Sequence, residues 1–140
     1  MKADEDPVEI ATRALQHRDR SRREVDERLA RAGIDEERRN DALETLERVG
    51  YVDDERFAGA RAEALADRGY GDDWIRHDLA EHGVTAAAVA AALGTVVPEA
   101  DRAAAIVERL GRNPKTGARL ARKGFGQDAL EAALGIDVAE

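Results

Sequence analysis

One short phrase of sequence occurs three times in this chain of 140 residues. It reads LARAGI at 29–34, LAEHGV at 79–84 and LARKGF at 120–125. When the phrases are aligned on their glycines, Leu stands four residues before each glycine, an apolar residue follows it, and an Ala-Leu pair ends ten residues after it. Such repetition predicts tandem units that stack on one another and share core, rather than one globular domain.

The repeated phrase has the pattern of a helix that ends at glycine. In the first unit, Val25 and Leu29 are spaced to fall on one helix face. Gly33, Gly83 and Gly124 are expected to stop the helix, because glycine readily adopts the left-handed conformation that follows a helix C-terminus. The apolar residue after each glycine then folds back onto the core. Each unit is predicted to contain this middle helix, with one helix before it and one after it.

The predicted helix starts carry capping residues. Asp6 and Asn113 each precede a proline, and Ser21 stands three residues before Glu24, as in a capping box. Together with the apolar spacing, these signals predict an all-α chain. The expected helices lie near 7–17, 22–32, 36–49, 54–68, 72–82, 86–94, 98–110, 114–123 and 127–134.

The predicted fold class is therefore all-α, an elongated, curved array of three tandem three-helix repeats with about nine helices. The repeats are expected at 7–50, 51–97 and 98–136. A flexible N-terminus at 1–6 and a flexible C-terminus at 137–140 are expected to flank them. The inequality of the spacings between glycines places the extra length where the first repeat meets the second.

The composition agrees with exposed amphipathic helices. Hydrophobic residues make up 43% of the chain but aromatic residues only 4%, while 37% of residues are charged. No run of about 18 apolar residues is present to span a membrane, and the start MKADEDPVEI is acidic, so a cytoplasmic protein is predicted. The absence of cysteine excludes disulfides, thiolate zinc sites and a cysteine nucleophile.

Charge is distributed unevenly along the sequence. The net charge of −8 argues against a general nucleic-acid binder, since such proteins usually carry excess Lys and Arg. One basic zone interrupts the acidity, with six cationic side chains and no acidic one: Arg109, Arg112, Lys115, Arg119, Arg122 and Lys123. Because Lys115, Arg119 and Arg122 share a helix face, the zone predicts either a contact with an anionic partner or a solvated face.

No pattern in the sequence indicates catalysis. His77 and His82 are five residues apart, whereas a zinc pair on one helix face needs a spacing of four, and His17 is distant. The acidic run 53–55 lies at a predicted helix start, where carboxylates cap free amides. No nucleophile beside a base and no phosphate-binding loop is found. The chain is not predicted to be an enzyme or to hold a metal or cofactor.

Several single residues invite an interpretation. Trp74 is expected either to pack between units or to stand exposed as an interface anchor. Tyr51 and Phe57, which flank the joint between the first two units, are expected in the core. Three arginines recur near the ends of first helices, where a cation complements the helix dipole: Arg18, Arg68 and Arg109.

The order of these motifs resembles the RecX family of regulatory proteins from about Ile10 to Leu134. The most specific phrase is GYVDDERFA at 50–58, which is close to the family pattern Gly-Tyr-Leu-Asp-Asp-x-x-Phe-Ala. At the expected distance it is followed by the family's next motif, made of Gly71, Ile75-Arg76, Leu79 and Gly83-Val84.

The resemblance implies a monomeric, all-helical modulator of RecA, the recombinase that polymerises on single-stranded DNA. Family members bind along the groove of the RecA–DNA filament and inhibit ATP hydrolysis, strand exchange or filament growth, and so regulate recombination, DNA repair and the SOS response. No catalysis and no cofactor are implied. Residues expected to contact RecA or DNA are Arg76, which matches the family pattern, and Arg112, Lys115, Arg119, Arg122 and Lys123.

Two other functions are compatible with the same helices. A helix-turn-helix DNA-binding protein would present cationic or amide side chains on its recognition helix, and residues 85–93 (TAAAVAAAL) present none. A helical-repeat scaffold for another protein partner needs the same architecture, so only a binding experiment separates it from the RecA hypothesis.

Overall fold

The computed structural model describes residues 5–135, which form nine α-helices and no strand. The helices are α1 (Pro7–Leu15), α2 (Arg22–Arg31), α3 (Glu36–Arg48), α4 (Asp54–Asp67), α5 (Asp72–Glu81), α6 (Ala86–Leu93), α7 (Glu99–Leu110), α8 (Pro114–Arg122) and α9 (Gln127–Leu134). The predicted all-α fold is confirmed. Of the predicted flexible ends, 1–4 and 137–140 lie outside the described residues, whereas Glu5 and Asp6 are described.

Three helices begin directly after the capping residues that were identified in the sequence. The Asp6 side chain accepts from the Val8 backbone N–H at 3.0 Å and so caps α1. At the start of α2, the Glu24 N–H donates to the Ser21 hydroxyl at 3.2 Å and the Ser21 N–H donates to the Glu24 carboxylate at 3.1 Å, which completes the capping box. The Asn113 side chain accepts from the Thr116 backbone N–H at 3.0 Å and so caps α8. Local sequence therefore determines these helix starts.

The three recurring glycines end the middle helices in the predicted conformation. Their φ angles are 86° at Gly33, 81° at Gly83 and 89° at Gly124. After each of them the chain turns back, and Ile34, Val84 and Phe125 are buried. The repeated phrase thus closes one helix and anchors the next connection to a core.

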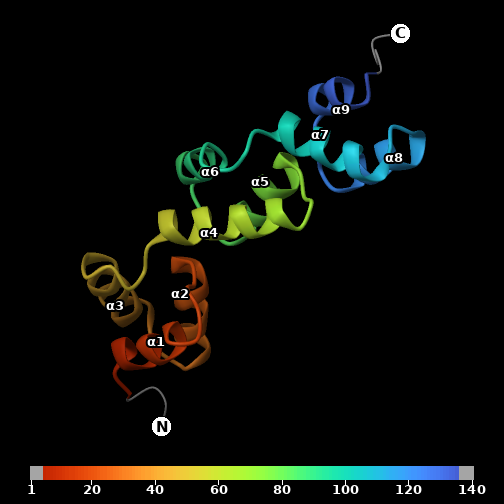
Figure 1. The fold of residues 1–140 in the computed structure, drawn as a ribbon. Helices are drawn as coiled ribbons and strands as arrows, with labels where there is room; N and C mark the ends of the chain where they lie inside the picture. The colour runs from red at the N-terminus through yellow and green to blue at the C-terminus, as the bar shows by residue number, and fades with distance from the viewer. Residues whose placement is uncertain (1–4, 136–140) are drawn as a thin grey trace.

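Three separate hydrophobic cores follow one another along an elongated molecule (Figure 1). We call α1–α3 unit 1, α4–α6 unit 2 and α7–α9 unit 3. Fully or nearly fully buried side chains at the centres of the cores include Val25, Leu29 and Leu43 in unit 1, Phe57, Ile75 and Leu79 in unit 2, and Val107, Leu120 and Phe125 in unit 3. The limits of the repeats at 7–50, 51–97 and 98–136 stay a prediction. Val52, which the prediction assigned to the second repeat, packs in the core of unit 1.

The two aromatic residues that flank the joint between the first two units differ in burial. Phe57 is buried as predicted, but Tyr51 is 57% exposed, so its assignment to the core was wrong. Tyr51 follows Gly50, whose φ is 84°, and this turn delivers the next residue, Val52, to the core instead. Along the described part of the chain, no helix is long and apolar enough to cross a membrane.

Unit 2 joins unit 3 through direct backbone contacts. The Gly71 N–H donates to the Lys123 carbonyl at 2.8 Å, and the Asp73 N–H donates to the Gly124 carbonyl at 3.1 Å. A Cβ on Gly71 would lie 2.5 Å from the Gly124 carbonyl, and one on Gly124 would lie 2.6 Å from the Trp74 nitrogen. Only glycine lets these two backbones approach so closely. The N-terminus of α5 therefore abuts the C-terminus of α8.

A carboxylate and a buried arginine complete this contact between units 2 and 3, which we call the second junction. Glu99, the first residue of α7, accepts from the Asp72 N–H at 2.6 Å and from the Gly126 N–H at 2.9 Å. Its negative charge thus lies at the N-termini of α5 and α9, where the helix dipole favours it. The Arg102 side chain is 9% exposed and bonds the Asp72 carboxylate at 2.8 Å and the Tyr70 carbonyl at 3.3 Å.

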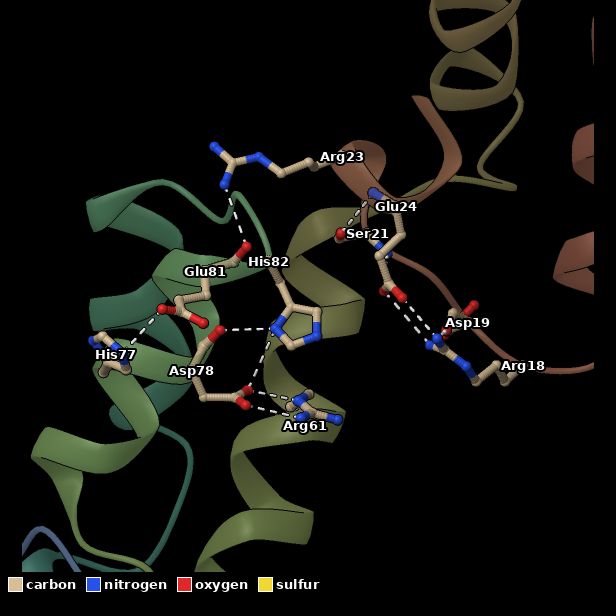
Figure 2. A network of polar contacts seen from close by, with 10 residues as sticks. All are labelled: Arg18, Asp19, Ser21, Arg23, Glu24, Arg61, His77, Asp78, Glu81 and His82. Carbon is tan, nitrogen blue, oxygen red and sulfur yellow. Dashed lines mark hydrogen bonds and ion pairs between the residues drawn. The ribbon is translucent and has the colours of Figure 1, made fainter. Parts of the chain in front are cut away.

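Unit 1 joins unit 2 through side chains, at a contact that we call the first junction (Figure 2). The Arg23 guanidinium, near the start of α2, donates to the Glu81 carbonyl at the end of α5 at 3.3 Å. A Cβ on Gly83 would lie 2.8 Å from the Cβ of Arg23. Arg56 bonds both carboxylate oxygens of Asp19 at 3.0 and 3.1 Å. The N-terminus of α2 thus meets the C-terminus of α5, as the N-terminus of α5 meets the C-terminus of α8.

Candidate interaction surface

In the part of the chain that the structure describes, seven arginines of units 1 and 2 are held in ion pairs with carboxylates of the same two units or of the segments beside them. Described pairs are Arg13–Glu5, Arg18–Glu24, Arg22–Glu47, Arg39–Asp26, Arg56–Asp19, Arg61–Asp78 and Arg76–Asp73. Among residues 5–135, none of the predicted cations at 112–123 has an ion pair. The basic zone of the sequence therefore becomes a surface of unpaired positive charge on α8 and just before it.

Arg76 lies apart from this surface. Its guanidinium is 2.6 Å from the Asp73 carboxylate one turn earlier on α5, and both side chains are exposed. It lines a shallow hollow together with Asp72, Glu99 and Asp128. The predicted contact residue thus has an acidic surrounding, and the structure does not bring it together with the five cations of unit 3.

Two of those five cations line a cleft between units 2 and 3. The cleft has a volume of about 600 Å³ and is bounded by the end of α4, the connection at 94–98, α7 and α8. We call it the interunit cleft. Arg119 and Lys123 line it from α8 and its C-cap, Arg109 lines it from α7, and Arg68 lines it from the end of α4. The basic zone is therefore partly enclosed, and it extends onto unit 2.

Aromatic rings hold the Lys123 side chain in place. Its amine lies 4.1 Å from the centroid of the Tyr70 ring, and the Arg68 guanidinium lies 5.6 Å from the same centroid. Tyr70 in turn stacks on Trp74, with ring centroids 4.6 Å apart. A cation over an aromatic face is stabilised by the ring quadrupole. Trp74 is 44% exposed although its backbone abuts unit 3, so it packs at the contact between units 2 and 3 and also has surface open to solvent.

The other three predicted cations lie outside the interunit cleft. Lys115 and Arg122 are exposed on α8, and Arg112 is exposed in the connection before it. Arg112 lines a separate hollow formed by α7 and the end of α9. The structure thus divides the basic zone into a cleft-facing pair, Arg119 and Lys123, and an outward-facing group.

Equivalent positions in the three units carry charge of alternating sign. The last turn of the middle helix holds Arg28 and Arg31 in α2, Asp78 and Glu81 in α5, and Arg119 and Arg122 in α8. These positions are five and two residues before the recurring glycine in every unit. At the same structural place, the repeated scaffold therefore presents positive charge from units 1 and 3 and negative charge from unit 2.

Sequence analysis missed the contribution of Arg68 and Arg109 to the interunit cleft. Both were expected to complement helix dipoles, and Arg109 was also counted in the basic zone. Arg109 does lie in the last turn of α7, whereas Arg68 follows α4 as its C-cap. Their recurrence at a fixed distance from the glycines was the available signal. In the described part of the chain, no group of three or more metal-ligating side chains comes together.

Both the sequence and the fold of this chain are similar to those of known proteins. The profile of a family described as "RecX, second three-helix domain" matches residues 53–93. The protein called Regulatory protein RecX of Stenotrophomonas maltophilia (strain K279a) is 33% identical over 94% of this chain and 86% of its own length. That of Xanthomonas oryzae pv. oryzae (strain PXO99A) is 32% identical over 94% of this chain and 88% of its own length.

Solved structures share the arrangement of helices. The crystal structure of RecX from Lactobacillus salivarius superposes with a TM-score of 0.81 and 18% sequence identity, covering 92% of both chains. A second structure, described as the crystal structure of regulatory protein RecX, has a TM-score of 0.78 and 20% identity, covering 94% of this chain and 74% of that one.

Proposed function

The chain belongs to the RecX family of regulatory proteins, and we propose that it binds the RecA–single-stranded DNA filament along its groove. In this proposal it acts in the cytoplasm as a monomer without catalysis or cofactor. It inhibits ATP hydrolysis, strand exchange and filament growth, and so regulates recombination, DNA repair and the SOS response. Single-stranded DNA is a partner mainly within the filament.

The observation that carries the proposal is the cationic surface of α8, which no carboxylate pairs among the described residues, at one end of an elongated array whose other two units carry more acidic than basic residues. An elongated array contacts consecutive subunits of a helical partner at once. Each further contact is then intramolecular, so weak contacts add up only on a filament with the right spacing. This geometry favours an assembled polymer over a single copy of its subunit.

Inhibition follows from the same geometry. A ligand that binds one arrangement of neighbouring subunits more tightly than the others shifts the population toward that arrangement. In this proposal, ATP hydrolysis and strand exchange need neighbouring filament subunits to move relative to one another, and an array that bridges the subunits slows these steps without any chemistry of its own.

The primary test is ATP hydrolysis by the cognate RecA on single-stranded DNA, titrated with this protein well below one molecule per RecA subunit. Binding to the same bare DNA is measured in parallel. Suppression of hydrolysis with little affinity for bare DNA is the expected result. Tight binding to bare DNA with unchanged hydrolysis would favour the helix-turn-helix alternative, although α6 consists of AAAVAAAL and offers no cation to a groove. No response in either assay would leave the scaffold alternative.

The proposed contact residues are tested by charge reversal. We expect Arg119→Glu with Arg122→Glu to weaken binding to the filament at least about tenfold, because two favourable contacts become repulsive. The matched control is Arg28→Glu with Arg31→Glu, which makes the same charge change at the equivalent positions of α2. Equal losses in both double variants at matched salt would mean that net charge, rather than the α8 surface, determines binding.

A further inference from the structure

The interunit cleft has an apolar floor. It is formed by Val96 and Val97 from the connection after α6, by Ile106 from α7 and by Leu120 from α8. Val97 is 59% exposed, which makes it one of the few large apolar side chains on the described surface. Exposed apolar area inside a concave site is typical of a binding surface.

The charged residues around this floor are of both signs. Glu63 and Asp67 on α4 and Asp101 near the start of α7 lie on the cleft, and none of these three carboxylates has an ion pair among the described residues. Arg109 lies eight residues after Asp101, which is about 12 Å along α7. The cleft therefore presents carboxylates from α4 and the start of α7 together with cations from the end of α7 and from α8.

This lining does not suit a nucleic-acid strand. Sites for single strands combine a continuous cationic groove that follows the phosphates with aromatic side chains that stack on bases. The described lining includes no aromatic residue, and its carboxylates would repel phosphates. The rings of Tyr70 and Trp74 are occupied by each other and by Lys123.

The cleft is preformed, because the second junction fixes its two sides. Backbone hydrogen bonds from Gly71 and Asp73 to the end of α8 hold unit 3 against unit 2. Arg102 also lies in the cleft wall, where it is 9% exposed and bonds Asp72 and the Val97 carbonyl. A site whose walls are already ordered loses less entropy when it binds a ligand.

We infer that the interunit cleft binds a segment of protein chain rather than nucleic acid. An apolar side chain of the segment packs on Val97 and Ile106, its acidic groups face Arg109, Arg119 and Lys123, and its basic groups face Glu63 and Asp67. This inference rests on the proposed function, since the segment belongs to the protein component of the filament. It assigns Arg119 and Lys123 to protein and leaves outward-facing Lys115 and Arg122 for DNA.

The test is a reversal of the acidic wall, for which the two possible ligands predict opposite signs. Glu63→Lys with Asp67→Lys is compared with Glu27→Lys with Glu44→Lys, which makes the same charge change on exposed positions of α2 and α3. Binding is measured on one biotinylated oligonucleotide, bare or coated with the cognate RecA, at fixed salt. We expect the cleft variant to bind the coated oligonucleotide about tenfold more weakly and the control to change less than about twofold.

A second variant tests the apolar floor without any large change in folding. Val97→Asp replaces an exposed side chain in a connection, and we expect it to weaken binding to the coated oligonucleotide at least about fivefold. Circular dichroism and thermal unfolding check that each variant is folded.

The possible results separate the inference from the proposed function. Tighter binding of the cleft variant than of the control to bare or coated DNA would assign the cleft to nucleic acid and overturn the inference. Unchanged binding of both cleft variants would also overturn it, while wild-type binding to the filament would leave the proposed function intact. Absence of wild-type binding to the coated oligonucleotide would overturn both.

Discussion

At the second junction α5 contacts α8 through backbone atoms, whereas at the first junction α2 reaches α5 through the side chain of Arg23. Both junctions place the N-terminus of a middle helix against the C-terminus of the next one. Gly71 is the N-cap of α5, and Ser21 is the equivalent N-cap of α2. Absence of a side chain at Gly71 allows direct contact at the second junction.

A carboxylate at the start of the following unit also recurs, with a different reach. Asp54, the first residue of α4, accepts from the Arg22 N–H at 2.7 Å. Glu99, the first residue of α7, is one methylene longer and accepts from backbone amides at the starts of both α5 and α9. One carboxylate therefore orients two helices at the second junction and one helix at the first.

The two junctions differ further in exposure. Arg56 and Asp19 at the first junction are 44% and 43% exposed, whereas Arg102 and Asp72 at the second are 9% and 23% exposed. Exposed ion pairs are weak and screened by salt, while a buried arginine that loses its partner is costly. The comparison indicates a rigid pair of units 2 and 3, and a more easily loosened attachment of unit 1.

The largest effect is expected from Gly71→Ala. The φ of Gly71 is −87°, which any residue adopts, so the cost comes only from the new Cβ against the Gly124 carbonyl. We expect a loss of about 3 kcal/mol in the free energy of unfolding, measured by urea denaturation. The control is Gly69→Ala, where φ is 88° but no atom lies within 4 Å of the new Cβ, with an expected loss of about 1 kcal/mol. Equal losses would show that the close backbone contact contributes little.

Removal of one carboxylate charge at each junction compares the two ion pairs directly. Asp72→Asn leaves Arg102 buried without its anion, and we expect a loss of about 2 kcal/mol, allowing for the partial exposure of Asp72. Asp19→Asn affects an exposed pair with Arg56, and we expect a loss of about 0.5 kcal/mol. Denaturation curves at low salt measure both. A larger loss for Asp19→Asn would reverse the assignment of the rigid junction.

The pH dependence of stability is tested at Asp78, beside the first junction (Figure 2). The hydrogen bond from Arg61 holds the pKa of Asp78 below its ordinary value, although partial burial opposes this. A lowered carboxyl pKa stabilises the fold above the ordinary pKa of about 4, and the stabilisation is lost as the pH falls through the folded-state pKa. We expect Asp78→Asn to cost about 1.5 kcal/mol at pH 7. The difference from wild type should shrink below pH 4 in thermal unfolding, and a constant difference down to the most acid pH would contradict this.

The smallest expected effect is that of salt on local opening. Raising the salt concentration should speed hydrogen exchange of the Arg22 amide, which Asp54 and the charged first junction protect, by about twofold. The Gly71 and Asp73 amides, which bond backbone carbonyls, should keep their protection. Equal acceleration at all three amides would mean that the junctions open together.

Most of the fold could be predicted because its determinants are local. Asp6, Ser21 and Asn113 cap helices within three residues of themselves, and the recurring glycines end helices through their own backbone conformation. Apolar spacing then assigns the buried face of each helix. Tyr51 was misplaced because the turn at Gly50 decides which of two adjacent apolar residues points inward.

The candidate surface could be predicted only in part. The run of cations around α8 is visible in the sequence, and none of the cations at 112–123 has an ion pair among the described residues. The structure divides these cations between the interunit cleft and an outward-facing group. The interunit cleft was not foreseen, because its acidic residues on α4 and its basic residues on α8 are more than fifty positions apart. Such a meeting depends on how one unit docks on the next.

Three similar helical units, their caps, their terminating glycines and the family to which they belong could all be predicted without coordinates. These features depend on interactions within a few residues, or on patterns that repeat. The roles of Gly71 and Gly124 as contact points between units, and of Glu99 at two helix starts, became visible in the three-dimensional arrangement of the units. Contacts between distant segments depend on the relative placement of rigid units, and no local pattern encodes that placement.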